Sequence, residues 1–204
     1  MYVRDAKNRD EVWLLDRIEE MDLTDPAFRS RDYVVALDEE TGQRAGLGRI
    51  RVHRDGADDT DDADDADAEF CELALVATPE RWRGQGVGAH VVERLVTKAG
   101  DAGFDDVYAV AAQPEYLLQF GFSPVDSERL PSPIADRLSA VREERGDDAI
   151  AVRVAVGEFE MPSRLRDRFK NATPGDDADG VSVEETAEDF GIDPDEVTYK
   201  YDTG

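Results

Sequence analysis

Residues 83–88, Arg-Gly-Gln-Gly-Val-Gly, stand between two segments with different hydrophobic patterns. The preceding segment, EFCELALVA (69–77), is almost continuously apolar, which is typical of a central strand covered on both faces. The following segment has apolar residues at helical spacing, which predicts a helix that begins at Val87 and ends near Gly100 and Gly103. Because a helix N-terminus presents unpaired N–H groups and glycines let a pyrophosphate approach them closely, we expect a diphosphate-bearing ligand at this loop.

Two common nucleotide-binding motifs do not match the loop completely. A mononucleotide P-loop requires Lys and then Ser or Thr after the glycines, whereas Val87-Gly88-Ala89-His90 follows here. A dinucleotide fingerprint, G-x-G-x-x-A, is matched by Gly84, Gly86 and Ala89, but it needs an acidic residue at the end of the next strand. That strand is expected to end in Ala111-Ala112, and the hairpins predicted upstream of the loop do not belong to that fold.

The other segments predict a mixed, mostly antiparallel α/β sheet of six to seven strands flanked by helices. A short strand (1–6) precedes a helix (8–21) whose expected apolar stripe is Val12, Leu14, Leu15 and Ile18. Residues 32–54 predict a hairpin with Gly42 at positive φ in the turn. After the strand and helix around the loop come a strand (107–112), a short helix (114–120), a helix (130–145) and a strand (149–156).

The net charge of the chain is extreme, at −25 from 49 acidic and 24 basic residues. Aspartate exceeds glutamate and lysine is scarce, a composition similar to that of salt-in halophiles, so we expect a halophilic and archaeal source. Self-repulsion of this size fades in molar salt, where the Debye length is about 3 Å. The same charge argues against binding of nucleic acid, whose phosphates would be repelled.

Several other classes of protein are disfavoured by the composition. No apolar run approaches the ~18 residues of a membrane span, and the N-terminus lacks the apolar region of a secretory signal, so we expect a cytoplasmic protein without a membrane partner. Cys71 is the single cysteine, which excludes an intrachain disulfide and a cysteine-based zinc site. His53 and His90 have no metal-ligand spacing; we expect both at the surface or half-buried, and no metal.

The loop and its surroundings resemble the GNAT superfamily of acetyl-CoA-dependent N-acetyltransferases, whose pyrophosphate loop has the pattern [R/Q]-x-x-G-x-[G/A]. In that superfamily the loop follows a strand that ends near a proline, as in LALVATPERWRGQGVG (73–88). A later helix is rich in aromatic residues and ends in Gly-Phe, as in PEYLLQFGF (114–122). The match covers about residues 1–156, and the segment PEYLLQFGFSPVDSERLP is also similar to the acetyltransferase part of N-acetylglutamate synthases.

Two details depart from the family pattern. Three residues (80–82) separate Pro79 from Arg83 where two are usual, and the tyrosine common in such enzymes would fall on Leu117 rather than on its neighbour Tyr116. The resemblance implies a GNAT fold with acetyl-CoA as co-substrate. It assigns the pantetheine arm and thioester to the backbone amides of Leu75, Val76 and Ala77, and the pyrophosphate to Arg83, Gly84, Gln85, Gly86, Val87 and Gly88.

Candidate catalytic residues follow from the chemistry of acetyl transfer to an amine, which needs a base for the ammonium and an acid for the departing thiolate. Glu72 is the candidate base, acting through a water, because a carboxylate within an apolar strand is desolvated and is therefore a stronger base. Its alternative is a structural place, either at the sheet rim or in an ion pair with an arginine. Tyr116 is the candidate acid toward the CoA sulfur, or else a packing aromatic.

Other polar residues near these candidates have structural interpretations as well. Cys71 faces the side of the strand opposite to Glu72 and is expected to be a buried structural thiol. Arg49 and Arg51 share one face of the third strand, where they would either hold a substrate carboxylate or pair with surface acids.

The expected organisation is one GNAT domain at 1–157, with an acidic disordered loop at 56–68, and a C-terminal extension at 158–204 that has an acidic linker and short helices. The basic run PSRLRDRFKN (162–171) would dock on the protein's own acidic surface or on a partner. The predicted function is direct acetyl transfer, in a ternary complex, from acetyl-CoA to a primary amine of an amino acid, small metabolite or protein. A homodimer is a further expectation. A non-catalytic acyl-CoA-binding or regulatory protein on the same scaffold is the alternative.

Overall fold

The computed structural model describes residues 1–23, 25, 27–54 and 69–175. The predictions for the acidic loop at 56–68 and for the linker and helices after 175 lie outside the described residues. Contacts divide the chain into two units, Met1–Pro174 and Gly175–Gly204, and the fold described here is that of the first. This unit extends past the boundary at 157 that was expected from the sequence, because the helix formed by the basic run packs within it.

A seven-stranded sheet with the order β1-β2-β3-β4-β5-β7-β6 forms the centre of this unit. All neighbouring strands are antiparallel except β4 and β5, which are parallel. This confirms the mixed, mostly antiparallel sheet that the sequence predicted. The strands are β1 (Tyr2–Asp5), β2 (Tyr33–Leu37), β3 (Arg44–Arg54), β4 (Glu69–Ala77), β5 (Asp106–Ala111), β6 (Ser123–Pro124) and β7 (Ile150–Ala155).

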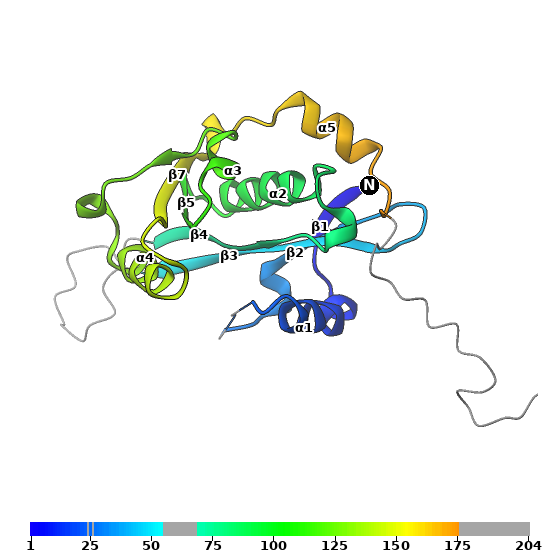
Figure 1. Ribbon diagram of the computed structural model, residues 1–204, viewed down its shortest axis with the longest axis horizontal. Coiled ribbons are helices and arrows are strands. Elements are labelled where there is room, and N and C mark those ends of the chain that lie inside the picture. Colours follow the sequence, from blue (N-terminus) through cyan, green and yellow to red (C-terminus); the bar gives the residue numbers. More distant parts are fainter. Residues whose placement is uncertain (24, 26, 55–68, 176–204) are drawn as a thin grey trace, which may run out of the picture. The chain divides into compact units, whose positions relative to one another are not determined.

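Helices cover both faces of the sheet (Figure 1). On one face lie α2 (Val87–Asp101), α3 (Glu115–Leu118) and α5 (Ser163–Lys170), and on the other lie α1 (Glu11–Glu20) and α4 (Ser132–Arg145). Short 3-10 turns occur at η1 (Asn8–Asp10), η2 (Ser30–Asp32), η3 (Glu80–Trp82), η4 (Ser127–Arg129) and η5 (Val156–Glu158). None of the helices within the described ranges combines the length and the apolar composition needed to cross a bilayer.

The helix α2 lies close against the sheet, and this contact fixes the position of the glycine loop at its start. The apolar residues whose helical spacing predicted it are all buried: Val87, Val91, Val92, Leu95, Val96 and Ala99. Gly48 on β3 permits the close approach, because a Cβ at this residue would lie 2.5 Å from Cγ1 of Val91 and 2.8 Å from Cδ1 of Leu95. Such distances are shorter than any carbon–carbon contact, so a side chain at Gly48 would push the helix away from the sheet.

The helix α1 buries a narrower stripe than the sequence predicted. Leu14 and Ile18 are buried against the sheet, but Val12 is 70% exposed and Leu15 is 45% exposed. The two buried positions are four residues apart and therefore lie one above the other on the helix. A ten-residue helix that contacts the sheet along one line has room for only this pair, which is why the broader stripe was wrong.

Candidate functional site

The strands β4 and β5 separate after a short parallel contact. Their register contains two pairs, Cys71 with Val107 and Glu72 with Tyr108, although β4 continues to Ala77 and β5 to Ala111. The edges that face each other beyond these pairs have no strand partner. A cavity of about 440 Å³ lies along this gap, lined by residues 73–76 of β4, residues 109–113, and side chains from α3 and α4 that include Tyr116, Leu117 and Arg137.

A β-bulge shapes the β4 edge of the cavity. Arg49 pairs with Leu75 and the next β3 residue pairs with Leu73, so Ala74 has no partner on β3. A bulge bends its strand and changes the direction of the following groups. Leu75 and Val76, whose amides the resemblance assigned to the pantetheine arm, line the cavity, whereas Ala77 belongs to the core between the sheet and α1. An open strand edge of this kind suits an extended ligand that contains amides.

The glycine loop enters α2 through two residues in the left-handed region. Gly84 has a φ of 71° and Gly86 a φ of 78°, and this conformation costs a residue with a side chain about 1–2 kcal/mol. Among the described residues, no acceptor is bonded to the N–H groups of Val87, Gly88 or Ala89. Three amides and the positive end of the helix dipole are therefore available to an anion.

The additional residue between Pro79 and the loop belongs to the 3-10 turn η3. This turn ends in Trp82, which is fully buried in the core beneath α2. Arg83 follows at the surface, where its Nε donates a hydrogen bond to the carbonyl oxygen of Thr78 at 3.1 Å. The turn thus absorbs the departure from the family spacing, and four of the five N–H donors of the guanidinium remain beside the loop.

The hydroxyl of Tyr116 lies next to the start of α2. A Cβ added to Gly88 would lie 2.8 Å from the Tyr116 oxygen and 3.3 Å from Oγ1 of Thr78. Tyr116 is 42% exposed and lines the cavity. Desolvation of the phenol raises the pKa of Tyr116 to about 12, so this group is protonated at neutral pH and can donate. Leu117, the position of the family tyrosine, is buried in the core instead.

Glu72 is buried, with 1% of its surface exposed, and its carboxylate faces one histidine and two arginine side chains. Nε2 of His53 lies 2.7 Å from Oε2, and Nη1 of Arg51 lies 4.0 Å from the same oxygen. Nε of Arg137, which reaches across from α4, lies 3.7 Å from Oε1. Both β3 side chains share a face because they are two residues apart on one strand.

These contacts correct the apolar environment that the sequence predicted for Glu72. The apolar neighbours Cys71 and Leu73 point to the α2 face of the sheet, whereas the Glu72 side carries charged groups. Hydrogen bonding and opposite charge therefore compensate the burial of this carboxylate. Cys71 is fully buried, and burial raises the pKa of its thiol to about 12. A thiol in that state is a poor nucleophile at neutral pH.

Arg49 and Arg51 share a face of β3, as the sequence predicted, but Arg49 is neutralised inside the protein. It pairs with Asp25, which also accepts a hydrogen bond from the hydroxyl of Tyr33. Asp32 lies 3.7 Å from the same guanidinium. Burial, followed by the contact with Asp25, raises the pKa of Tyr33 above its ordinary value. Arg49 thus has a structural role, and its acidic partner Asp25 is buried rather than at the surface.

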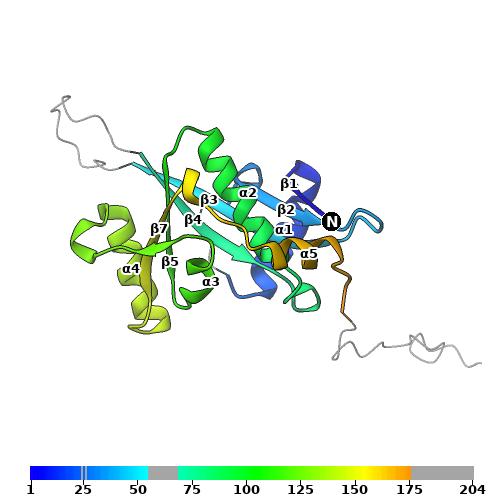
Figure 2. The ribbon, with the colours of Figure 1, turned by 90° about the horizontal axis from the view of Figure 1, so that it is seen from above.

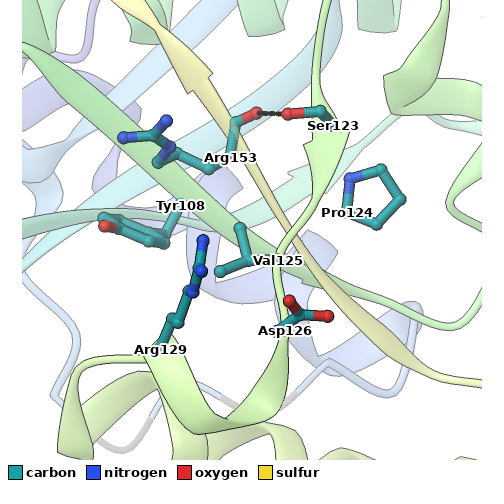
Figure 3. Close-up of a pocket in the computed structure, with 7 residues that line it drawn as sticks. All are labelled: Tyr108, Ser123, Pro124, Val125, Asp126, Arg129 and Arg153. Atoms are coloured by element: carbon teal, nitrogen blue, oxygen red, sulfur yellow. Dashed lines mark hydrogen bonds between the residues drawn. The ribbon is translucent and has the colours of Figure 1, made fainter.

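A second polar pocket lies on the same face of the sheet, two strands away from Glu72. Successive register partners form one row across the sheet: Arg51, Glu72, Tyr108, Arg153 and Ser123. The pocket has a volume of about 290 Å³ and includes Arg129 from η4. Figure 3 shows Arg129 and Arg153 approaching the Tyr108 ring from opposite sides. Ser123 donates a hydrogen bond to the Arg153 carbonyl at 3.4 Å, and the Arg153 guanidinium pairs with Asp106 at 3.0 Å.

Sequence reasoning missed two groups at Glu72. His53 was expected to be half-buried, and it is, but its contact with Glu72 depends on the register between β3 and β4. Arg137 gave no signal, because the sequence does not indicate which face of the sheet α4 covers. Across the described ranges, no group of three or more His, Cys, Asp or Glu side chains is arranged to hold a metal ion.

Solved structures with the same fold include three that bind CoA or transfer acetyl groups. Rv2747 from Mycobacterium tuberculosis in complex with CoA has a TM-score of 0.57 and 15% identity, over 76% of this chain and 99% of that chain. N-acetylglutamate synthase from Neisseria gonorrhoeae, complexed with CoA and N-acetyl-glutamate, has a TM-score of 0.53 and 16% identity, over 76% of this chain but only 34% of the synthase. Arylalkylamine N-acetyltransferase 2 from Aedes aegypti has a TM-score of 0.50 and 12% identity, over 76% and 98% of the two chains.

Sequence comparison gives the family directly. No curated protein sequence matches this chain. The family model described as Acetyltransferase (GNAT) family matches residues 3–122, which is more than half of the 204 residues. The match includes β4, the glycine loop, α2 and the helix that carries Tyr116. The chain therefore belongs to the GNAT family of acetyltransferases.

Proposed function

We propose that this protein transfers the acetyl group of acetyl-CoA directly to the amine of a small acceptor that also carries a carboxylate. The observation that carries the proposal is the cavity between β4 and β5, which has an open strand edge and Tyr116 on one side and Arg137 on the other. Arg137 is also 3.7 Å from Glu72, so it connects the cavity with the buried carboxylate.

The residues of this chain fit acetyl-CoA. The three free amides at residues 87–89 suit a pyrophosphate, and the missing side chain of Gly88 leaves them accessible between Tyr116 and Thr78. Leu75 and Val76 offer backbone groups to the amides of a pantetheine arm. When bound, acetyl-CoA supplies the activated acyl group as a thioester.

Glu72 and His53 form the route by which the acceptor loses a proton. An amine is protonated at neutral pH and cannot attack a carbonyl until that proton has left. Glu72 accepts the proton on a carboxylate oxygen through a water, because its side chain is buried behind the cavity lining. His53, at 2.7 Å from Oε2 and 16% exposed, connects this carboxylate with solvent. Because His53 contacts Glu72 and acts on the acceptor only through it, His53 is a positioning residue.

Tyr116 has the complementary role on the opposite side of the cavity. Its phenol is protonated at neutral pH because its pKa is raised to about 12. It lines the cavity together with Leu75 and Val76, where the pantetheine arm would end, and would donate its proton or a hydrogen bond to the departing sulfur. The acid and the base thus come from opposite faces of the sheet, and the gap between β4 and β5 connects them.

Arg137 gives the acceptor class. Its guanidinium is 34% exposed and lies at 3.7 Å from Glu72, which leaves donors free to bind a carboxylate in the bidentate geometry that arginine favours. An amino acid presents an amine and a carboxylate at a short, fixed separation. Such an acceptor would place its amine at Glu72 while Arg137 holds its carboxylate.

The acceptor class is tested with amino acids and their decarboxylated amines, assayed by release of free thiol in molar salt. We expect turnover with amino acids and a KM at least tenfold higher for the matching amines, because a charge-assisted hydrogen bond contributes about 1.5–3 kcal/mol. Arg137→Gln should raise the KM of the amino acid similarly. Arg142→Gln is the matched control, because Arg142 lies on the same helix and bonds the carbonyl of Ala149. Equal KM values for amino acids and their decarboxylated amines would refute recognition of an acceptor carboxylate.

The base is tested with Glu72→Gln. This variant should lower kcat by about 10²–10³ and leave the Kd of CoA unchanged. An unchanged kcat would show that Glu72 is structural. Binding of CoA by the unmodified protein without turnover of any amine would favour the non-catalytic alternative.

A further inference from the structure

The helix α5 crosses the N-terminal end of α2 (Figure 2). At its start, Nη2 of Arg164 donates to Oε1 of Gln119, next to α3, at 2.6 Å. Near its end, Nη1 of Arg168 donates to the carbonyl of Gly84, in the glycine loop, at 3.3 Å. The basic run of the sequence therefore docks on the protein itself, from the α3 side of the cavity to the loop.

The segment after α5 is bonded to the loop by a reciprocal pair of hydrogen bonds. Nε2 of Gln85 donates to the Thr173 carbonyl at 2.7 Å, and the Thr173 N–H donates to Oε1 of Gln85 at 2.8 Å. The side-chain amide of Gln85, which the resemblance assigned to the pyrophosphate, is thus occupied by the C-terminal arm, defined here as residues 163–173.

Apolar packing holds the C-terminal arm against the loop. Leu165 and Phe169 are buried, and the Phe169 ring is stacked on His90 with a centroid separation of 3.8 Å. Gly86 allows this contact, since a Cβ there would lie 2.4 Å from the Leu165 carbonyl oxygen. His90 in turn contacts the Gly86 carbonyl through Nδ1 at 3.0 Å. Leu165 and Phe169 therefore hold the C-terminal arm against Gly86 and His90.

The charge of Arg168 has no acidic partner among the described residues. Arg166 pairs with Glu93 on α2 at 2.7 Å, whereas the contact of Arg168 is with a neutral carbonyl. The space beside Gly84 is open, because a Cβ there would meet no atom within 4 Å. In a chain of net charge −25, a phosphate-bearing ligand meets repulsion, and an unpaired guanidinium at the loop offsets it locally.

We propose that the C-terminal arm forms part of the CoA site and that Arg168 binds a phosphate group of CoA beside the loop amides. This inference rests on the proposed function, because it adds a residue to the same co-substrate site. It also gives α5 a role that follows from its position, as a wall of the phosphate site held in place by Gln85, Gly86 and His90.

The test is calorimetric titration of the full chain with CoA. Arg168→Gln should raise the Kd of CoA about tenfold at moderate salt, with a smaller effect in molar salt where charges are screened. Arg164→Gln, which removes the same charge from the same helix, should change the Kd less than twofold because its partner is Gln119. Arg168→Lys should recover part of the affinity, since the charge is retained.

A second measurement separates binding of phosphate from a structural effect. Acetyl-pantetheine carries the thioester without the nucleotide, so its kcat/KM should be the same in the unmodified protein and in Arg168→Gln. An unchanged Kd of CoA in Arg168→Gln would overturn the proposal, and a lower Kd would also overturn it by showing that the arm competes with CoA. Failure of the unmodified protein to bind CoA would instead refute the proposed function.

Discussion

Gly86→Ala and Gly84→Ala form a matched pair that measures how firmly the C-terminal arm holds the loop. Both glycines have positive φ, 71° for Gly84 and 78° for Gly86. A Cβ at Gly84 would meet open space, whereas a Cβ at Gly86 would lie 2.4 Å from the carbonyl oxygen of Leu165. The first substitution therefore introduces backbone strain alone, and the second introduces the same strain and a clash with α5.

The magnitudes follow from these two terms. An alanine in the left-handed region costs about 1–2 kcal/mol, which applies to both variants. The clash in Gly86→Ala is with backbone, so α5 must move away, and the burial of Leu165 and Phe169 is lost. Two such side chains contribute about 3–6 kcal/mol when fully buried, and the conformational entropy regained by the released segment offsets most of this. We expect Gly86→Ala to lose about 1–2 kcal/mol more than Gly84→Ala.

Urea unfolding in molar salt gives the free energies, and tryptic digestion of the native protein gives the opening of α5. The helix contains four basic residues at 164, 166, 168 and 170, so its cleavage rate reports its local stability. Cleavage should be about tenfold faster in Gly86→Ala and unchanged in Gly84→Ala. Equal unfolding free energies together with equal digestion rates would refute the packing of α5 on the loop.

Three further predictions concern protonation. Tyr116→Phe should lower kcat at least tenfold without changing the Kd of CoA. The pKa of Tyr116 is raised to about 12, so the phenol should stay protonated well above neutral pH. A fall in activity near pH 9 that is absent in Tyr116→Phe would contradict that protonation state. Burial would raise the pKa of Asp10, but hydrogen bonds from Arg4 and Arg44 outweigh it and lower the pKa from 3.8 to about 2. This carboxylate should therefore contribute about 2 kcal/mol above pH 4, lost as the pH falls to 2, so Asp10→Asn should be less stable in urea at pH 7 and equal to the unmodified protein near pH 2. Burial lowers the pKa of His90 below 6.5, so stability should fall as the pH drops through 6.5 toward the folded-state pKa; urea unfolding between pH 5 and 8 should show no such dependence in His90→Gln.

The parts of the site that depend on local pattern could be predicted from the sequence. The apolar run of β4, the glycines and the helical spacing after Val87 are contiguous, so they predicted the strand, loop and helix together. Tyr116 was located by its place in a short helix, although its direction toward Gly88 depends on how that helix packs.

Groups brought together by register or by helix packing could not be predicted. Glu72 was expected among apolar groups, because its sequence neighbours are apolar, but its spatial neighbours come from β3 and α4. The basic run was expected to dock on the protein's own acidic surface or on a partner, and its described contacts are within the protein. Leu165 and Phe169, four residues apart within it, are the signal that it has a buried apolar side as well.

The position of α4 has a consequence for how this protein could acquire new acceptors. The segment that connects β6 with β7 and contains α4 begins and ends at neighbouring positions of the sheet, because the N–H of Val125 donates to the carbonyl of Ala151 at 3.0 Å. Replacing residues 126–148 by another segment would therefore leave the paired ends of β6 and β7 in place. Such a replacement would change Arg129 and Arg137 but leave β4, the glycine loop and α2 unchanged. Selectivity for the acceptor could therefore evolve without a change of the fold.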